Sequence, residues 1–215
     1  MDEEIAIIDA NTRYQKIQNF FINNKKKLII TFVLFISILF GYFIYESQIK
    51  KNKIKLANQY SKATINFASN NNENVKISLI ELVHKKDKTY SPLALYFLID
   101  NDILTEKKEM NDLFNSLIEE TKLEEEIINL IIYKKALFNS EYASENELLN
   151  ILNPLIKSDS VWKSHALHLM GEFLISKKEN LKAKEFFEKI LTLENSNLSI
   201  KLDAKKRLQR DFGEK

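Results

Sequence analysis

The sequence predicts an all-α protein in which one N-terminal transmembrane helix precedes a series of α-helical hairpins. Three observations predict this fold class. The 215 residues include only three glycines and two prolines, so the tight turns of a β-sheet protein lack the residues that they require. One uncharged apolar run near the N-terminus is long enough to cross a membrane. Apolar residues at helical spacing then continue almost to the C-terminus.

The transmembrane helix is predicted over residues 28–45. This segment, LIITFVLFISILFGYFIY, has no charged residue and reaches the minimum length that an α-helix needs to cross the hydrocarbon core. Three lysines lie directly before it, at Lys25, Lys26 and Lys27, and aromatic residues lie at its other end. No cleavage site with small residues follows the segment, so we expect an uncleaved anchor rather than a signal peptide.

The charges around the anchor predict its orientation only weakly, because lysines occur on both sides. The three lysines that adjoin Leu28 favour a cytoplasmic N-terminus, and long C-terminal domains cross the membrane largely regardless of their charge. The predicted domains are a cytoplasmic tail over residues 1–27, the anchor over 28–45 and a helical repeat domain over 46–215. Apolar residues of the tail could contact the membrane or a partner, or only belong to a loose helix that sets topology: Ile5, Ile8, Tyr14, Ile17 and Phe21.

Breaks in the helical pattern recur at similar intervals through residues 46–215, at 70–74, Tyr90-Ser91-Pro92, 139–144, 157–160 and 195–197. Four pairs of large apolar residues start 35, 35 and 38 residues apart: Leu79-x-x-Leu82, Phe114-x-x-Leu117, Leu149-x-x-Leu152 and Phe187-x-x-Ile190. This period is close to that of tetratricopeptide repeats and predicts a tetratricopeptide-like α-hairpin solenoid. An irregular helical bundle with coincidental spacing is the alternative. The final helix, over residues 198–212, is expected to close the series with Leu198, Leu202 and Leu208 on its apolar face.

The last repeat matches the tetratricopeptide pattern most clearly. Small residues are expected where its two helices approach each other, and an aromatic residue is expected to fill the space between hairpins. Asn195 stands where the pattern has proline, and Trp162 lies too far ahead to be the tryptophan of the pattern. The predicted repeat-packing residues are Trp162, Ala166, Leu169, Gly171, Ala183, Phe187 and Ile190.

The sequence contains no signature of an enzyme. It has no cysteine, no glycine-rich phosphate loop, no serine nucleophile elbow and no HExxH motif. His165, His168 and Glu172 could face a metal from one helix, but this spacing is also common on helix surfaces, which is the interpretation we favour. Acidic residues over 119–126 indicate a solvated turn. We therefore expect no catalytic, cofactor or metal site, and the dispersed net charge of +2 disfavours nucleic acid as a partner.

The order of these elements resembles a known family, the ancillary subunits of the SecYEG translocon, in its alphaproteobacterial form. The resemblance rests on the acidic opening Asp2–Ile5, the lysines before the anchor, the W-x-x-x-A-x-x-L-x-G segment from Trp162 to Gly171, and A-x-x-x-F from Ala183 to Phe187. The motifs are short, and the order of elements extends over nearly the whole chain.

This resemblance implies a single-pass protein of the bacterial inner membrane with a cytoplasmic N-terminus and a periplasmic repeat domain. It implies a chaperone-like role in protein export, with the SecYEG channel, a membrane-anchored periplasmic prolyl isomerase and exported client proteins as partners. The alternative is a structural scaffold or adaptor of a cell-envelope or cell-division complex. A cytoplasmic regulator with inverted topology is a third possibility.

Overall fold

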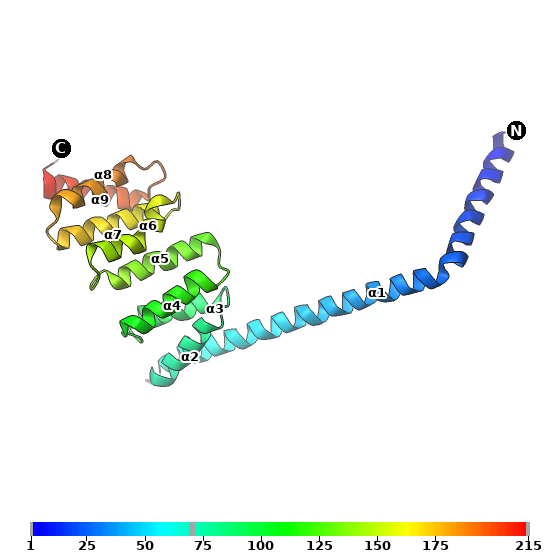
Figure 1. Ribbon diagram of the computed structural model, residues 1–215, viewed down its shortest axis with the longest axis horizontal. Helices are drawn as coiled ribbons and strands as arrows, with labels where there is room; N and C mark the ends of the chain where they lie inside the picture. The colour runs from blue at the N-terminus through cyan, green and yellow to red at the C-terminus, as the bar shows by residue number, and fades with distance from the viewer. Residues whose placement is uncertain (1, 69–71, 214–215) are drawn as a thin grey trace. The chain divides into compact units, whose positions relative to one another are not determined.

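A computed structural model describes the backbone of residues 2–68 and 72–213, and the side chains of residues 13–68 and 73–213. The described residues form helices joined by turns and contain no strand, so the all-α prediction is confirmed (Figure 1). The helices are α1 (Asp2–Phe67), α2 (Asn72–His84), α3 (Tyr90–Asp100), α4 (Lys107–Glu120), α5 (Glu125–Asn139), α6 (Glu145–Lys157), α7 (Lys163–Ser176), α8 (Asn180–Thr192) and α9 (Leu198–Phe212).

The chain divides into two units, Met1–Lys55 and Leu56–Lys215. The first unit consists of helix α1 up to Lys55, and no turn interrupts this helix at the predicted boundaries of the anchor. Residues 46–55, which we assigned to the repeat domain, continue the helix that contains the apolar run. The acidic opening and the side chains of Ile5 and Ile8 lie outside the described side chains.

The second unit packs the end of α1, from Leu56, with α2 to α9. Each helix from α2 to α8 contacts the helix that follows it, and α2 with α4, α5 with α7, and α7 with α9 also touch. Two apolar clusters fill the space between them. One is centred on Phe114 and Leu79 from the earlier helices, and the other on Phe187 and Met170 from the later ones.

The four recurring apolar pairs lie on alternate helices, α2, α4, α6 and α8. Every member is completely buried except Leu149, which is half-buried. The recurring pairs therefore mark the inward face of every second helix. Their burial is the regularity on which the hairpin prediction depends.

Several helix boundaries are determined by side chains that satisfy free backbone groups. In α6, the Ser144 hydroxyl accepts from the backbone N–H of Glu147, and the Glu147 carboxylate accepts from that of Ser144. In α9, the Asn197 side chain accepts from the N–H groups of Ser199 and Ile200. Such caps occupy N–H groups that have no partner within the helix.

The turn before α3 differs from the sequence prediction, which placed a break at Tyr90-Ser91-Pro92. These residues form the first turn of α3, and the connection lies at residues 85–89 instead. The buried Ser91 hydroxyl donates to the carbonyl oxygen of Leu82 at 2.7 Å and accepts from the N–H of Asp87 at 2.9 Å. Proline is compatible with this position because N–H groups of the first helical turn need no partner in the helix.

The final helix buries a different face from the one we expected. Ala204 and Leu208 are buried against the later cluster, whereas Leu198 and Leu202 are 70% and 52% exposed. The prediction that all three leucines share an inward face was therefore wrong. Residues four apart lie on one helical face, so Ala204 and Leu208 define the inward face and the other two leucines belong to a different one.

Candidate functional site

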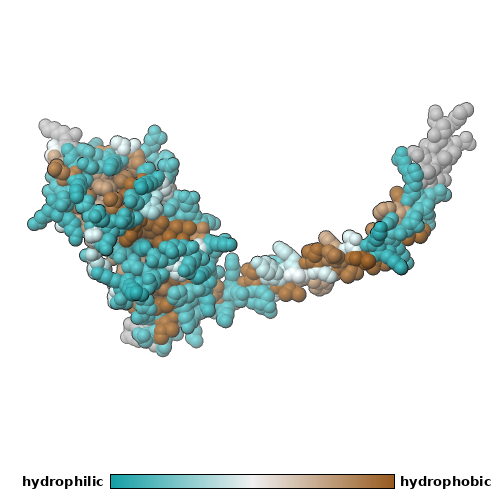
Figure 2. All heavy atoms as spheres, viewed as in Figure 1, coloured by the Kyte–Doolittle hydropathy of each residue, from teal (hydrophilic) through white to brown (hydrophobic). Residues whose placement is uncertain are grey.

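The apolar run of α1 exposes large apolar side chains along its whole length. Phe32 is 63% and Phe40 is 65% exposed, and no residue between 28 and 45 is buried. Figure 2 shows this run as an apolar stretch of the helix with hydrophilic residues before and after it. Within the described residues, α1 is the one helix that is long and apolar enough to cross a membrane.

The two aliphatic hydroxyl groups inside the run are satisfied by the helix itself. The Thr31 hydroxyl donates to the carbonyl oxygen of Lys27, and the Ser37 hydroxyl donates to that of Val33, each at 2.9 Å. A polar group in hydrocarbon has no water to bond to, so it needs a partner within the protein. Lys25, Lys26 and Lys27 are all exposed at the polar edge of the run, where their ammonium groups can remain hydrated.

The predicted packing residues of the last repeat lie together at the contact between α7 and α8. Ala166, Gly171, Ala183, Phe187 and Ile190 are buried, as members of one apolar cluster or directly beside it. A methyl group added at Gly171 would lie 2.8 Å from ring carbons Cε1 and Cζ of Phe187. The absence of a side chain at Gly171 thus lets the buried ring of Phe187 lie directly against α7.

Trp162 and Leu169 take less buried positions than the other five predicted packing residues. Trp162 directly precedes α7, and its ring stacks on Tyr133 of α5 with centroids 5.5 Å apart and an interplanar angle of 29°. His165 lies against both rings, with its centroid 5.1 Å from that of Trp162. Trp162 therefore joins α7 to α5, while Leu169 is half-buried beside the core.

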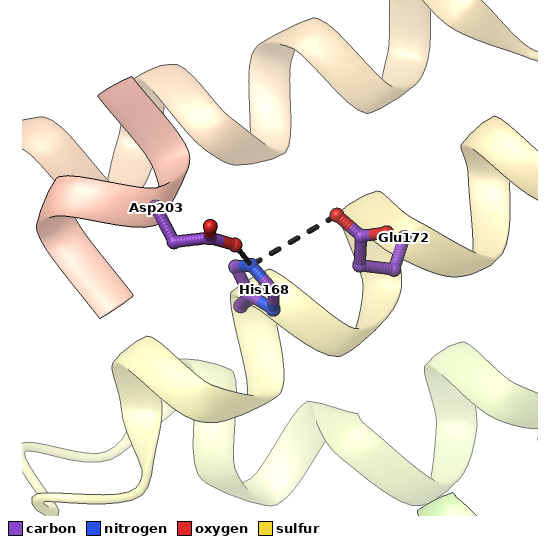
Figure 3. A group of neighbouring side chains, drawn as sticks. All are labelled: His168, Glu172 and Asp203. Atoms are coloured by element: carbon purple, nitrogen blue, oxygen red, sulfur yellow. Dashed lines mark hydrogen bonds and ion pairs between the residues drawn. The ribbon is translucent and has the colours of Figure 1, made fainter. Parts of the chain in front are cut away.

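The two histidines of α7 do not converge on one point. Burial beside the aromatic rings lowers the pKa of His165. His168 instead points toward α9, where its Nε2 lies 2.7 Å from Oδ2 of Asp203 and 3.9 Å from Oε1 of Glu172 (Figure 3). The set that we considered as metal ligands, His165 with His168 and Glu172, is therefore not formed.

The group that does form is His168, Glu172 and Asp203, whose ligand-type atoms lie within 4.8 Å of one another. The guanidinium of Arg207 pairs with Glu172, and its other nitrogen contacts Asp211 at 3.3 Å. A fixed cation beside Glu172 opposes the binding of a second cation there. The arrangement is thus an ion-pair network that joins α7 to α9. Neither Asp203 nor Arg207 carried any signal in the sequence.

The acidic residues over 119–126 are also distributed among separate partners. Glu120 pairs with Lys86 at 2.5 Å, and this contact lowers the pKa of its carboxyl group. Glu126 accepts a hydrogen bond from the Ser160 hydroxyl at 2.8 Å. The carboxylates therefore face different neighbours. This arrangement agrees with the solvated turn that the sequence predicted.

A cleft of about 410 Å³, lined by both polar and apolar side chains, lies between α4, α6 and the turn after α5. Asn111 and Asn139 join α4 to α5 through two reciprocal amide hydrogen bonds of 3.0 and 2.9 Å. Lys107 Nζ lies 3.4 Å from the centre of the Tyr142 ring at the edge of the cleft. Each amide oxygen accepts one of these bonds and keeps a second lone pair, so the cleft presents hydrogen-bond acceptors beside an aromatic surface.

Comparisons of this chain with protein families, with curated proteins and with solved structures find no match. The resemblance to translocon subunits therefore stays an expectation from the residues.

Proposed function

We propose that this protein is a membrane-tethered protein-binding module, in which α1 spans the membrane once and residues 56–215 form a tetratricopeptide-like solenoid that binds polypeptides. The observation that carries the proposal is the apolar run of α1, in which no residue is buried and the Thr31 and Ser37 hydroxyls both donate to backbone carbonyl oxygens of the helix. A water-soluble helix keeps one polar face, and this run has none.

The binding role is supported by the second unit, residues 56–215, which we call the hairpin unit. Recurring pairs buried on alternate helices, together with contacts between alternate helices such as α5 with α7, are features of stacked helical repeats. Stacked repeats bind other proteins through extended surfaces rather than through a single deep pocket. The cleft that contains Asn111, Asn139 and Tyr142 offers acceptors and an aromatic ring to an extended polypeptide.

The proposal includes the cellular role implied by the resemblance. The N-terminus is in the cytoplasm, the hairpin unit is in the periplasm, and the partners are exported chains leaving the SecYEG channel together with a membrane-anchored prolyl isomerase. Tethering raises the local concentration of a weak binding surface at the exit site. A scaffold of an envelope or cell-division complex would use the same fold with stable partners.

The topology is tested by cysteine labelling, because the chain has no cysteine of its own. Glu141→Cys and Gln18→Cys place single thiols at exposed positions of the hairpin unit and of the tail. In cells with a permeabilised outer membrane, a membrane-impermeant maleimide should label Glu141→Cys alone. Labelling of Gln18→Cys alone would overturn the periplasmic location.

Binding is tested by a photo-crosslinking amino acid at Asn150, which is exposed at the cleft, with Leu181 as the control position. Leu181 is 82% exposed on α8 and lies outside the cleft. Crosslinks from position 150 to channel subunits and to many exported chains support the export role. Crosslinks to one stable set of envelope proteins support the scaffold instead, and equal yields at both positions contradict binding at the cleft.

A further inference from the structure

A cluster of lysines follows the apolar run on the same unbroken helix. Lys50, Lys51, Lys53 and Lys55 are all exposed. Lys50 contacts Glu46 at 2.9 Å, and the other three have no ion-pair partner among the described residues. No Asp or Glu occurs over residues 47–72. Apart from Lys50, these lysines therefore carry positive charge that no acidic side chain of the described residues neutralises.

The distance along the helix places the backbone of these lysines at and just beyond the outer edge of the headgroup layer if Tyr45 marks the edge of the hydrocarbon. With a rise of about 1.5 Å per residue, Lys50 lies about 7.5 Å and Lys55 about 15 Å beyond Tyr45. The headgroup layer is about 5–8 Å thick on each side, and a lysine side chain can extend back toward it. The first three ammonium groups can thus enter this layer, and the fourth lies within about one Debye length, roughly 8 Å.

The directions of the side chains also match a layer that surrounds the helix. Successive residues are rotated by about 100°, so Lys50, Lys51, Lys53 and Lys55 spread over roughly 200° of the circumference. A docked protein would contact one face of the helix, whereas lipid headgroups surround it. Both the spread and the exposure of the four lysines therefore favour lipids over a protein partner.

We infer that Lys50, Lys51, Lys53 and Lys55 bind the phosphate groups of anionic lipids in the leaflet from which the C-terminal end of the run emerges. The inference rests on the proposed membrane span and adds a ligand class to it. Juxtamembrane lysines gain favourable interaction with anionic headgroups, and the gain falls as salt screens it. The lysines would enrich anionic lipids around the helix and hold the end of the span at the headgroup layer.

The test uses the full chain in vesicles of phosphatidylcholine with phosphatidylglycerol. Electron spin resonance with chain-labelled lipids measures how strongly each lipid associates with the protein relative to the other. For the unaltered chain we expect a preference for phosphatidylglycerol of about threefold or more at low salt. The variant with Lys50, Lys51, Lys53 and Lys55 all replaced by Gln should lose at least half of this preference, and high salt should reduce it in the unaltered chain.

The matched control replaces four lysines of the hairpin unit by Gln: Lys85, Lys88, Lys122 and Lys157, all exposed and without an ion-pair partner among the described residues. This variant should keep the preference. The inference is overturned if the unaltered chain and the variant with Lys50, Lys51, Lys53 and Lys55 replaced show the same preference for phosphatidylglycerol. It is also overturned if the control loses as much of this preference as that variant does. Either outcome leaves the proposed membrane span intact. Failure of the unaltered chain to stay in vesicles at alkaline pH overturns the span and the inference together.

Discussion

Two apolar regions of this protein meet their surroundings in opposite ways. The core around α7 and α8 hides Met170 and Phe187 completely, whereas the run of α1 leaves Phe32 and Phe40 more than half exposed. Both regions are rich in Leu, Ile and Phe. They differ in periodicity, because α8 alternates apolar residues with charged ones and the run has no polar face. The arrangement of apolar residues, more than their number, determines whether a helix packs against protein or requires lipid.

The largest effect is expected from charges placed in the run. Val33→Asp with Ile36→Asp should reduce membrane insertion by about 5–7 kcal/mol, since each central Asp costs about 2.5–3.5 kcal/mol. The measurement is the fraction of protein that remains in membranes after alkaline extraction. Leu198→Asp with Leu202→Asp, on an exposed face of α9, is the control and should remain in the membrane fraction. Retention of the first variant would mean that the run does not span the membrane.

The next largest effect is expected from a substitution in the core around α7 and α8. Phe187→Ala should lower the free energy of unfolding of the hairpin unit by about 3–5 kcal/mol, because it leaves a cavity in the core. Trp162 is the only tryptophan, so its fluorescence follows unfolding of this unit in urea. Leu181→Ala, at a residue that is 82% exposed, should change the midpoint very little. Similar effects of the two substitutions would contradict the assignment of the core.

A smaller effect concerns the close approach of α7 and α8. Gly171→Ala should gain about 1 kcal/mol of helix propensity but lose about 1–3 kcal/mol, because its methyl group meets the Phe187 ring. In the Phe187→Leu background this clash is relieved, so the same substitution should become neutral or stabilising. Urea unfolding of the four proteins gives the coupling between the two positions. If the effects of the two substitutions on the free energy of unfolding were additive, the Phe187 ring would not restrict the size of the side chain at position 171.

The smallest expected effect is a pH dependence that arises from the partly buried His165. Burial lowers the pKa of His165 below its ordinary value of 6.5, so the unfolded chain takes up the proton first as the pH falls. The contribution of His165 to stability is therefore complete above about pH 6.5 and decreases below it. His165→Phe keeps an aromatic ring beside Tyr133 and Trp162 and should weaken the fall in the urea midpoint between pH 7.5 and pH 5.5.

His84→Gln is the control for this measurement, because His84 is exposed on the last turn of α2. It should follow the unaltered chain across the same pH range. A His165→Phe variant that loses as much stability on acidification as the unaltered chain would show that another group dominates.

The sequence predicted well those features that depend on local pattern. The helical class and the apolar run follow from residues close together in the chain, and the pairs such as Leu79 with Leu82 are buried on alternate helices. Helix boundaries were less predictable. Tyr90-Ser91-Pro92 has the composition of a turn, but the buried hydroxyl of Ser91 bonds to α2 and keeps these residues in the first turn of α3.

The candidate sites were harder to predict because their members come from distant segments. His168 meets Asp203 and Glu172 meets Arg207 only because α9 packs beside α7. The amide pair of Asn111 and Asn139 requires α4 and α5 to lie side by side. In a chain rich in lysine and asparagine, no single such residue stands out before the fold brings two of them together.

By itself, the sequence determined that this protein is helical, that residues 28–45 have no polar face, and that pairs of large apolar residues three positions apart recur in four segments of the chain. These properties depend on neighbours three or four residues away, which any helix brings onto one face. Only the tertiary structure decided that Leu208 is buried while Leu198 and Leu202 are exposed, and that His165 and His168 turn to different helices. The reason is that burial and pairing depend on which distant helix covers a face, and local periodicity contains no information about that.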